Sequence, residues 1–132
     1  MNLLLDTHAF LWSLFSPEKL SHAAICEMKL PDNHLAVSVV SFWEISLKYA
    51  LGKLELIGVK PDDLPRYAAQ MNLETLPISP TEASTFYRLP RLHHKDPFDR
   101  LIIWQAIQHN MTLISKDKDF QAYSHLGLKT LW

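Results

Sequence analysis

Leu3-Leu4-Leu5-Asp6, a run of three leucines that stops at an aspartate, is the stretch of this chain that decides the fold. A second stretch of the same kind, Met111-Thr112-Leu113-Ile114-Ser115, is followed closely by Asp117. Short and continuously apolar runs are typical of strands that are buried on both faces of a parallel sheet. Because ligands bind at the carboxyl ends of the strands in such sheets, we expect both aspartates where the fold does its chemistry.

Two further acids are expected on the inner faces of helices. Glu44 shares the apolar stripe of a helical pattern with Val40, Leu47 and Leu51. Asp99 lies in a second helical pattern and shares its face with Ile102, Ile103 and Ala106. That second helix is apolar nearly all round, so its pattern predicts burial of Asp99 less clearly than the first pattern predicts burial of Glu44.

The four acids together predict a metal site. An ionised carboxylate on a buried stripe is costly without a partner, and four converging carboxylates repel one another. A divalent cation resolves both problems, and hard oxygen ligands suit Mg²⁺ or Mn²⁺. We therefore expect Asp6, Glu44, Asp99 and Asp117 to be both the metal ligands and the catalytic residues.

The composition limits the class of protein. The chain has 132 residues, of which 48% are hydrophobic and 20% charged, which fits one domain (residues 1–132) with a sizeable core. The net charge of −1 does not demand a nucleic-acid partner, so RNA or DNA binding would need a local basic patch. The single cysteine, Cys26, excludes an internal disulfide. There is no apolar run of membrane-spanning length and no signal peptide, so we expect a cytoplasmic protein.

The predicted elements alternate along the chain. The expected strands are residues 2–5, 35–38, 74–78, 111–115 and 128–132, and the expected helices are residues 8–15, 21–30, 40–51, 61–71, 81–89, 97–110 and 118–125. Ser21 is a candidate N-cap, and Gly52 and Gly127 are candidate helix stops. Strands that alternate with helices predict an α/β fold with a mainly parallel sheet that is covered on both faces.

Each acid also has a purely structural interpretation. Asp6 and Asp117 would be ordinary N-caps, and Ser41-x-x-Glu44 matches a capping box. In Asp96-Pro97-Phe98-Asp99, Asp96 would be the N-cap and Asp99 an acid in the first helical turn. Taken singly, these interpretations are about as good as the functional one. The joint placement of all four acids at one edge of the sheet favours function.

A basic segment precedes the acidic helix. It would usually be a solvated loop, but beside an acidic metal site it could hold a phosphate backbone. The candidate RNA-binding residues in and near it are Arg88, Arg91, His93, His94, Lys95, Arg100 and Lys116. A zinc site built on the two histidines is disfavoured, because there are no cysteine partners and no regular ligand spacing. The four tryptophans lie in apolar patterns and are expected in the core or in interfaces rather than as stacking platforms for bases.

Four motifs together resemble the PIN-domain family, and most of all the VapC-type toxins of bacterial toxin–antitoxin pairs. They are Leu4-Leu5-Asp6-Thr7-His8, Ser41-x-Trp43-Glu44-Ile45, His94-Lys95-Asp96-Pro97-Phe98-Asp99-Arg100-Leu101 and Leu113-Ile114-Ser115-Lys116-Asp117-x-x-Phe120, and they span the chain in order. The resemblance implies a three-layer α/β/α fold and a Mg²⁺- or Mn²⁺-dependent ribonuclease. It implies an acidic quartet at Asp6, Glu44, Asp99 and Asp117, and accessory roles for Thr7, Ser115 and Asp96. Ser115 stands where threonine is commoner in the family, and it keeps the hydroxyl.

The resemblance also implies partners, namely an RNA substrate, a small antitoxin and a second copy of the chain. The apolar patterns around residues 8–15 and 40–51 support this, because one sheet is not expected to cover Phe10, Trp12, Phe42, Trp43 and Tyr49 together. We expect a homodimer and a groove for an amphipathic antitoxin segment.

Three alternatives stay open at this point. The chain could be a stand-alone nuclease with no antitoxin. It could be a phosphoacceptor receiver, in which an aspartate at a strand end takes up a phosphoryl group beside Mg²⁺, although the first strand supplies only Asp6 and no central strand ends in Asp. It could also be a non-catalytic binding module in which the acids are caps.

Overall fold

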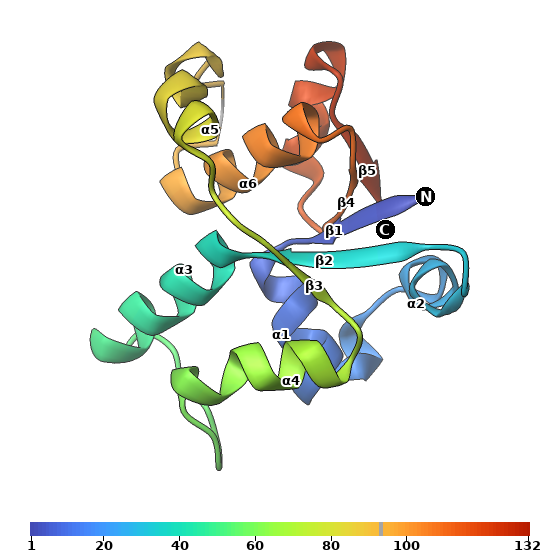
Figure 1. Ribbon diagram of the computed structural model, residues 1–132, viewed down its shortest axis with the longest axis vertical. Coiled ribbons are helices and arrows are strands. Elements are labelled where there is room, and N and C mark those ends of the chain that lie inside the picture. The colour runs from blue at the N-terminus through green and yellow to red at the C-terminus, as the bar shows by residue number, and fades with distance from the viewer. Residues whose placement is uncertain (93) are drawn as a thin grey trace.

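A five-stranded parallel sheet forms the centre of the protein, seen in a computed structural model that describes residues 1–92 and 94–132 (Figure 1). The strands are β1 (Asn2–Leu5), β2 (His34–Ser38), β3 (Glu74–Leu76), β4 (Thr112–Ile114) and β5 (Lys129–Leu131). Their order across the sheet is β3-β2-β1-β4-β5, and all four neighbouring pairs are parallel. The central strand β1 pairs Leu4 with Ala36 of β2 and with Leu113 of β4.

Helices make the crossovers that parallel strands require. The α-helices are α1 (Thr7–Phe15), α2 (His22–Lys29), α3 (Val39–Ala50), α4 (Leu64–Gln70), α5 (Pro80–Thr85) and α6 (Pro97–Gln108). Short 3₁₀ helices are η1 (Pro17–Lys19), η2 (Pro61–Asp63), η3 (Phe86–Arg88) and η4 (Lys118–Leu126). Figure 1 shows α1 and α4 on one side of the sheet and α5 and α6 on the other. None of the helices in the described part of the chain has the length and hydrophobicity needed to cross a membrane.

The side chains of β1 alternate between two cores, as expected for a strand that is buried on both faces. Leu3 and Leu5 pack with residues of α1, α2 and α4, among them Phe10, while Leu4 packs with residues of α6 and η4, among them Ile103. All three leucines are fully buried. The three-layer arrangement confirms the fold class predicted from the sequence.

The predicted element boundaries hold at some ends and fail at others. The strand at residues 2–5 is as predicted, Ser21 caps α2, and Gly52 and Gly127 have the positive φ of helix stops, +70° and +100°. Three predicted α-helices contain 3₁₀ turns instead. Residues 61–71 divide into η2 and α4, residues 81–89 into α5 and η3, and residues 118–125 form the 3₁₀ helix η4. In the first two segments the 3₁₀ turn stands at one end of the α-helix, where such turns are frequent.

The aromatic residues of α1 and α3 are covered to different degrees. Phe10 is fully buried and meets the ring of Phe42 edge-on, with ring centroids 5.7 Å apart. Trp12 is partly buried against Trp132. Trp43 and Tyr49 remain exposed, at 58% and 41%. Most of the uncovered apolar surface on these two helices therefore lies on α3, while Phe15 at the end of α1 is exposed by 43%.

Candidate active site

The fold brings the four predicted acids to one edge of the sheet. Asp6 follows β1 and Asp117 follows the neighbouring strand β4, so the carboxyl ends of these strands place them side by side. Asp6, Asp99 and Asp117 line one hollow of about 220 Å³, together with His8, Trp12, Lys116 and Phe120. Carboxylate oxygens of Glu44, Asp96 and Asp99 lie within 4.8 Å of one another. Asp99 belongs to both groups and connects them.

Asp6 is a helix cap and a buried acid at once. Its Oδ1 accepts a hydrogen bond of 2.7 Å from the backbone N–H of Ala9, which caps α1 as the structural interpretation predicted. Only 5% of the residue is exposed. Burial raises the pKa of Asp6 despite the opposing hydrogen bonds of Ser115 and Ala9 and the charge of His8, and nearby Glu44 raises it further. A cation in the hollow would relieve this cost.

Glu44 faces the site from the middle of α3 and has no capping role. The N-cap of α3 is Ser38, whose Oγ accepts a hydrogen bond from the backbone N–H of Val40. The capping-box interpretation of Ser41 and Glu44 was therefore wrong, because the helix begins before Ser41. Glu44 is instead a buried acid inside the protein.

Both carboxylate oxygens of Glu44 have partners. The hydroxyl of Thr7 lies 2.6 Å from Oε1, and the ammonium of Lys48 donates to Oε2 at 2.5 Å. Thr7 also lies 2.9 Å from the buried hydroxyl of Ser41. Burial alone would lower the pKa of Lys48, but its hydrogen bond to Glu44 and the charges of Glu44, Asp96 and Asp99 raise it on balance.

Asp96 and Asp99 occupy different positions at the start of α6. Asp96 is the N-cap, and its Oδ1 accepts from the backbone N–H groups of Phe98 at 2.8 Å and Asp99 at 3.3 Å. Asp99 is one turn further on, and its Oδ2 is 2.8 Å from Nε2 of His94. Burial raises the pKa of Asp99 to about 6, opposed by the hydrogen bond from His94 and reinforced by Asp96 and Glu44.

Asp117 is the most open of the four acids. It caps η4 by accepting from the backbone N–H of Asp119 at 2.9 Å, while its own N–H donates to the hydroxyl of buried Ser115 at 3.1 Å. Its Oδ2 lies 4.0 Å from Nε2 of His94. Ligand atoms of His94, Asp117 and Asp119 gather within 4.8 Å of one another, so Asp119 is a further acid beside the site.

The predicted basic residues divide into three sets. His94 and Lys116 are at the acids, the first by contact with Asp99 and the second as part of the hollow. Arg100 is not at the acids, because its guanidinium donates to the carbonyl of Leu89 at 3.0 Å and lies over the ring of Phe86. Its expected contact with RNA stays a prediction. Arg88, Arg91 and Lys95 are exposed, and His93 lies outside the described residues.

Sequence reasoning missed several residues of the site. Lys48 could have been found, because a lysine four positions after a glutamate on a helix forms an ion pair with it. His8 and Trp12 lie on α1 directly after Asp6, with ring centroids 5.6 Å apart. Their position in the hollow depends on how α1 leaves the sheet, and the sequence pattern does not specify that.

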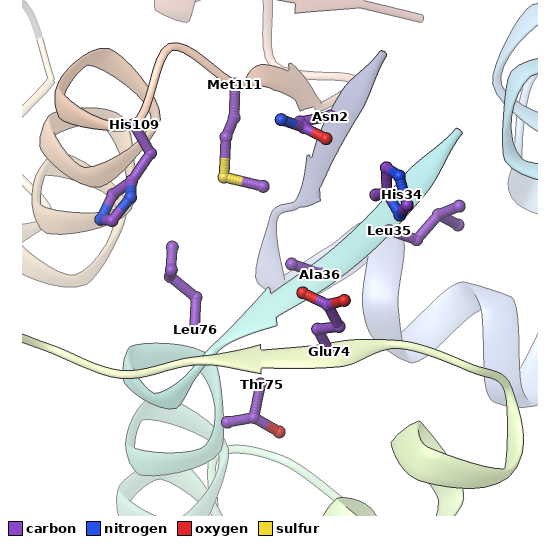
Figure 2. Close-up of a pocket in the computed structure, with 9 residues that line it drawn as sticks. All are labelled: Asn2, His34, Leu35, Ala36, Glu74, Thr75, Leu76, His109 and Met111. Carbon is purple, nitrogen blue, oxygen red and sulfur yellow. The ribbon is translucent and has the colours of Figure 1, made fainter. Parts of the chain in front are cut away.

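A second hollow lies at the opposite edge of the sheet (Figure 2). It has a volume of about 230 Å³, and its walls include the first residues of β1, β2 and β3 and the end of α6, among them His34, Glu74 and His109. None of the four predicted acids lines it. Ligands of parallel α/β sheets bind at the carboxyl ends of the strands, so this hollow is at the wrong edge for the predicted chemistry.

The donor set at the acidic edge fits a hard divalent cation. Its ligating atoms are carboxylate oxygens with one imidazole beside them, and the described part of the chain places no cysteine there. Such oxygen-rich sets suit Mg²⁺ and Mn²⁺ and do not resemble a closed structural zinc site. Burial is the largest cause of the raised pKa values of Asp6 and Asp99, and a bound cation would lower both.

Comparison with known proteins gives matches along the whole chain. The family model of the PIN domain matches residues 3–126. Ribonuclease VapC22 of Mycobacterium tuberculosis is 32% identical over 129 residues, which are 98% of this chain and 97% of that protein. VapBC2 of Rickettsia felis, solved bound to a DNA fragment from its promoter, has a TM-score of 0.71 at 21% identity and covers 100% of both chains. VapBC-5 of M. tuberculosis, a member of the VapBC family of toxin-antitoxin systems, has a TM-score of 0.57 at 20% identity, with 98% of this chain and 97% of that chain covered.

Proposed function

The chain belongs to the PIN-domain family, and from this premise we propose that it is a metal-dependent endoribonuclease, the toxin of a toxin–antitoxin pair. The observation that carries the proposal is the gathering of Asp6, Glu44, Asp99 and Asp117 at the carboxyl edge of the sheet. Its substrate is RNA, and the reaction is hydrolysis of a phosphodiester bond. RNA is met in the cytoplasm, where we place the activity.

The acids would hold Mg²⁺ or Mn²⁺, with Asp6, Asp99 and Asp117 nearest to the open hollow. When bound, the cation favours ionisation of the attacking water and stabilises negative charge on the phosphate. The chain needs no serine or cysteine nucleophile for this reaction. Thr7 fixes the carboxylate of Glu44, and Ser115 bonds to the backbone of Asp117, so both accessory hydroxyls position acids.

RNA would reach the hollow along cationic side chains. Lys116 lines the hollow and is exposed, so its ammonium can meet a phosphate beside the acids. Arg88, Arg91 and Lys95 are exposed on the chain that leads to Asp96 and Asp99, and they would contact the backbone further away. Trp12 has its ring within 5.9 Å of the Lys116 ammonium and offers an apolar wall to a ribose or base.

The antitoxin would dock on apolar surface beside the acids. A hollow of about 150 Å³ is lined by Val40, Trp43, Phe86, Pro97, Phe98 and Leu101. Trp43 precedes Glu44 and Phe98 precedes Asp99, so a segment that fills this hollow passes next to the site. An amphipathic helix of the antitoxin suits such a hollow, because its apolar face covers the rings while a polar end reaches the acids.

The receiver alternative does not fit the sheet. The receiver fold has strand order 2-1-3-4-5, with its third strand in the centre. Here the order is β3-β2-β1-β4-β5, with β1 in the centre and β3 at an edge. β3 ends at Leu76, so it supplies no acceptor aspartate.

Cleavage of a defined RNA tests the proposal. We expect the purified chain to cut single-stranded RNA internally with Mn²⁺ or Mg²⁺ and to lose that activity in EDTA and in the Asp117→Asn variant. Lys118→Gln is the control, because Lys118 is exposed on η4 and outside the hollow. Binding of Mn²⁺ with no cleavage of any RNA would favour a non-catalytic module. Copurification with the product of an adjacent small open reading frame would separate a toxin from a stand-alone nuclease.

A further inference from the structure

The two ends of the acidic cluster differ in how much of their hydrogen-bonding capacity is already used. At the end on α3, Thr7 and Lys48 engage both oxygens of Glu44. At the other end, Asp99 has one oxygen on His94, and no donor in the described part of the chain is bonded to its Oδ1. Asp99 also lines the hollow with Asp6 and Asp117, whereas Glu44 does not.

Lys48 is held in place by more than its ion pair. Its ammonium lies 5.9 Å from the centre of the Phe98 ring, and only 32% of its side chain is exposed. The charges of Asp96 and Asp99 act on it as well as that of Glu44. The ammonium is bonded to Glu44, and carboxylate oxygens of Glu44, Asp96 and Asp99 lie within 4.8 Å of one another. A cation in that position is a fixed counter-charge and differs from a mobile surface lysine.

We infer that the Lys48 ammonium is the built-in cation of the Glu44 end, so that the site takes a single divalent metal ion, held at Asp6, Asp99 and Asp117. This inference rests on the proposed metal-dependent function. It states which acids of the site bind the metal ion and which acid is paired with Lys48. A second divalent ion at Glu44 would have to displace Lys48 and break the contact with Thr7. Repulsion between the ammonium and a divalent ion a few ångströms away opposes simultaneous occupation.

Lys48 is accordingly a positioning residue. It offsets the charge of the Glu44 carboxylate, so that the divalent ion has to offset the charge of the aspartates alone. It also holds the Glu44 carboxylate in place beside the Thr7 hydroxyl. Removing the ammonium should open Glu44, with its neighbours Asp96 and Asp99, to a second hard cation.

Calorimetric titration of the full chain with Mn²⁺ tests this division, and electron paramagnetic resonance of the bound Mn²⁺ reports whether two ions lie close together. We expect wild type to bind one Mn²⁺ with the spectrum of an isolated ion. Lys48→Met should bind two, with the broadened spectrum of a coupled pair. Lys48→Arg should restore binding of one ion, and Lys53→Met, at an exposed lysine, should behave as wild type.

Glu44→Gln supplies an independent measurement if Lys48→Met does not fold. It should still bind one Mn²⁺, and more tightly than Asp99→Asn, which should weaken binding at least tenfold. Two ions bound by wild type, or one ion bound by a folded Lys48→Met variant, would overturn the inference and leave the proposed nuclease standing. No Mn²⁺ binding by wild type would overturn the proposed function itself.

Discussion

Asp96 and Asp99 stand three residues apart in the same acidic motif and have different roles. Asp96 is occupied with two backbone N–H groups of α6, while Asp99 points its carboxylate at His94 and the hollow. Asp6 and Asp117 show that a capping acid can also line the candidate site, because each uses one oxygen as a cap and lines the hollow as well. The structural and functional interpretations of these acids were therefore not exclusive.

The first prediction separates Asp96 from Asp99 by mutation. Asp96→Asn should keep near-wild-type RNA cleavage and stability, because asparagine caps a helix nearly as well as aspartate. Asp99→Asn should abolish metal-dependent cleavage and leave the fold intact. Cleavage rates and circular dichroism of the two variants check this. A variant pair with the opposite pattern would show that the third catalytic acid is Asp96.

The second prediction concerns the pH dependence of stability at Asp99. Burial raises the folded-state pKa of Asp99 from 3.8 to about 6. Because the folded pKa is raised, the ionised carboxylate destabilises the metal-free protein above about pH 6, and the penalty vanishes as pH falls below 3.8. Asp99→Asn should therefore stabilise the metal-free protein by up to roughly 3 kcal/mol at pH 7.5. Urea unfolding in EDTA at pH 7.5 and pH 4.5 should show the gain shrinking, and an equal gain at both values would contradict the assignment.

At the scale of elements, hydrophobic patterns located the strands and helices, and the details of capping decided where they begin. Asp6 and Asp117 were predictable from the apolar runs at residues 3–5 and 111–115, and Glu44 and Asp99 from their helical patterns. The start of α3 was not, because Ser38 and Ser41 are both good N-caps and only the end of β2 decides between them. The long-range partners of each acid, such as Thr7 for Glu44, depend on how the elements pack and were not predictable.

A buried polar network joins α5 to α6, and nothing in the sequence patterns pointed to it. Glu82 caps its own helix through the backbone N–H of Ser79 and accepts from Gln105 at 3.1 Å and from His109. Gln105 in turn accepts from the Ser38 hydroxyl and donates to the carbonyl of Pro77. The network connects the ends of β2 and β3 to α6, and so steadies the helix that carries Asp99.

The third prediction tests this network through Glu82. Burial would raise the pKa of Glu82, but hydrogen bonds from Gln105, His109 and the Ser79 backbone lower it below 4.5 on balance. A depressed folded pKa contributes stability that is present above 4.5 and is lost as pH falls through the folded value. Glu82→Gln should cost about 1–3 kcal/mol at pH 7 and less at pH 3.5. Denaturant unfolding at both pH values measures the cost, and Glu55→Gln, at an exposed position, is the control that should cost nothing.

At the scale of the whole molecule, the acids gathered at one edge of the sheet lower the free energy of unfolding of the metal-free protein. Mn²⁺ or Mg²⁺ at about 100 times its dissociation constant should stabilise the protein by about 2.7 kcal/mol. For a domain of this size, that corresponds to a rise in melting temperature of roughly 5–10 °C. Thermal melts with Mn²⁺ and with EDTA check this fourth prediction. The Asp99→Asn variant should melt at nearly the same temperature in both, and an unchanged wild-type melt in saturating Mn²⁺ would count against the site.

The fifth prediction follows from the apolar stripe on α3. The stripe consists of Trp43, Leu47 and Leu51, which follow one another at intervals of four residues. They therefore lie on one face of α3 and just beyond its end. Their exposed fractions are 58%, 39% and 59%. A contiguous apolar stripe on a surface marks an interface, and a second copy of the chain would cover its Leu47 and Leu51 end, leaving open both the hollow at Trp43 and the hollow at Asp6, Asp99 and Asp117.

We therefore expect a homodimer at micromolar concentration by light scattering, and a monomer for Leu51→Glu, because a charge at the stripe would be buried without a partner. Ile57→Glu is the matched control, since Ile57 is 92% exposed and lies off α3. A wild-type monomer would refute the dimer. A dimer that Ile57→Glu breaks and Leu51→Glu leaves intact would move the interface from α3 to the turn that follows it.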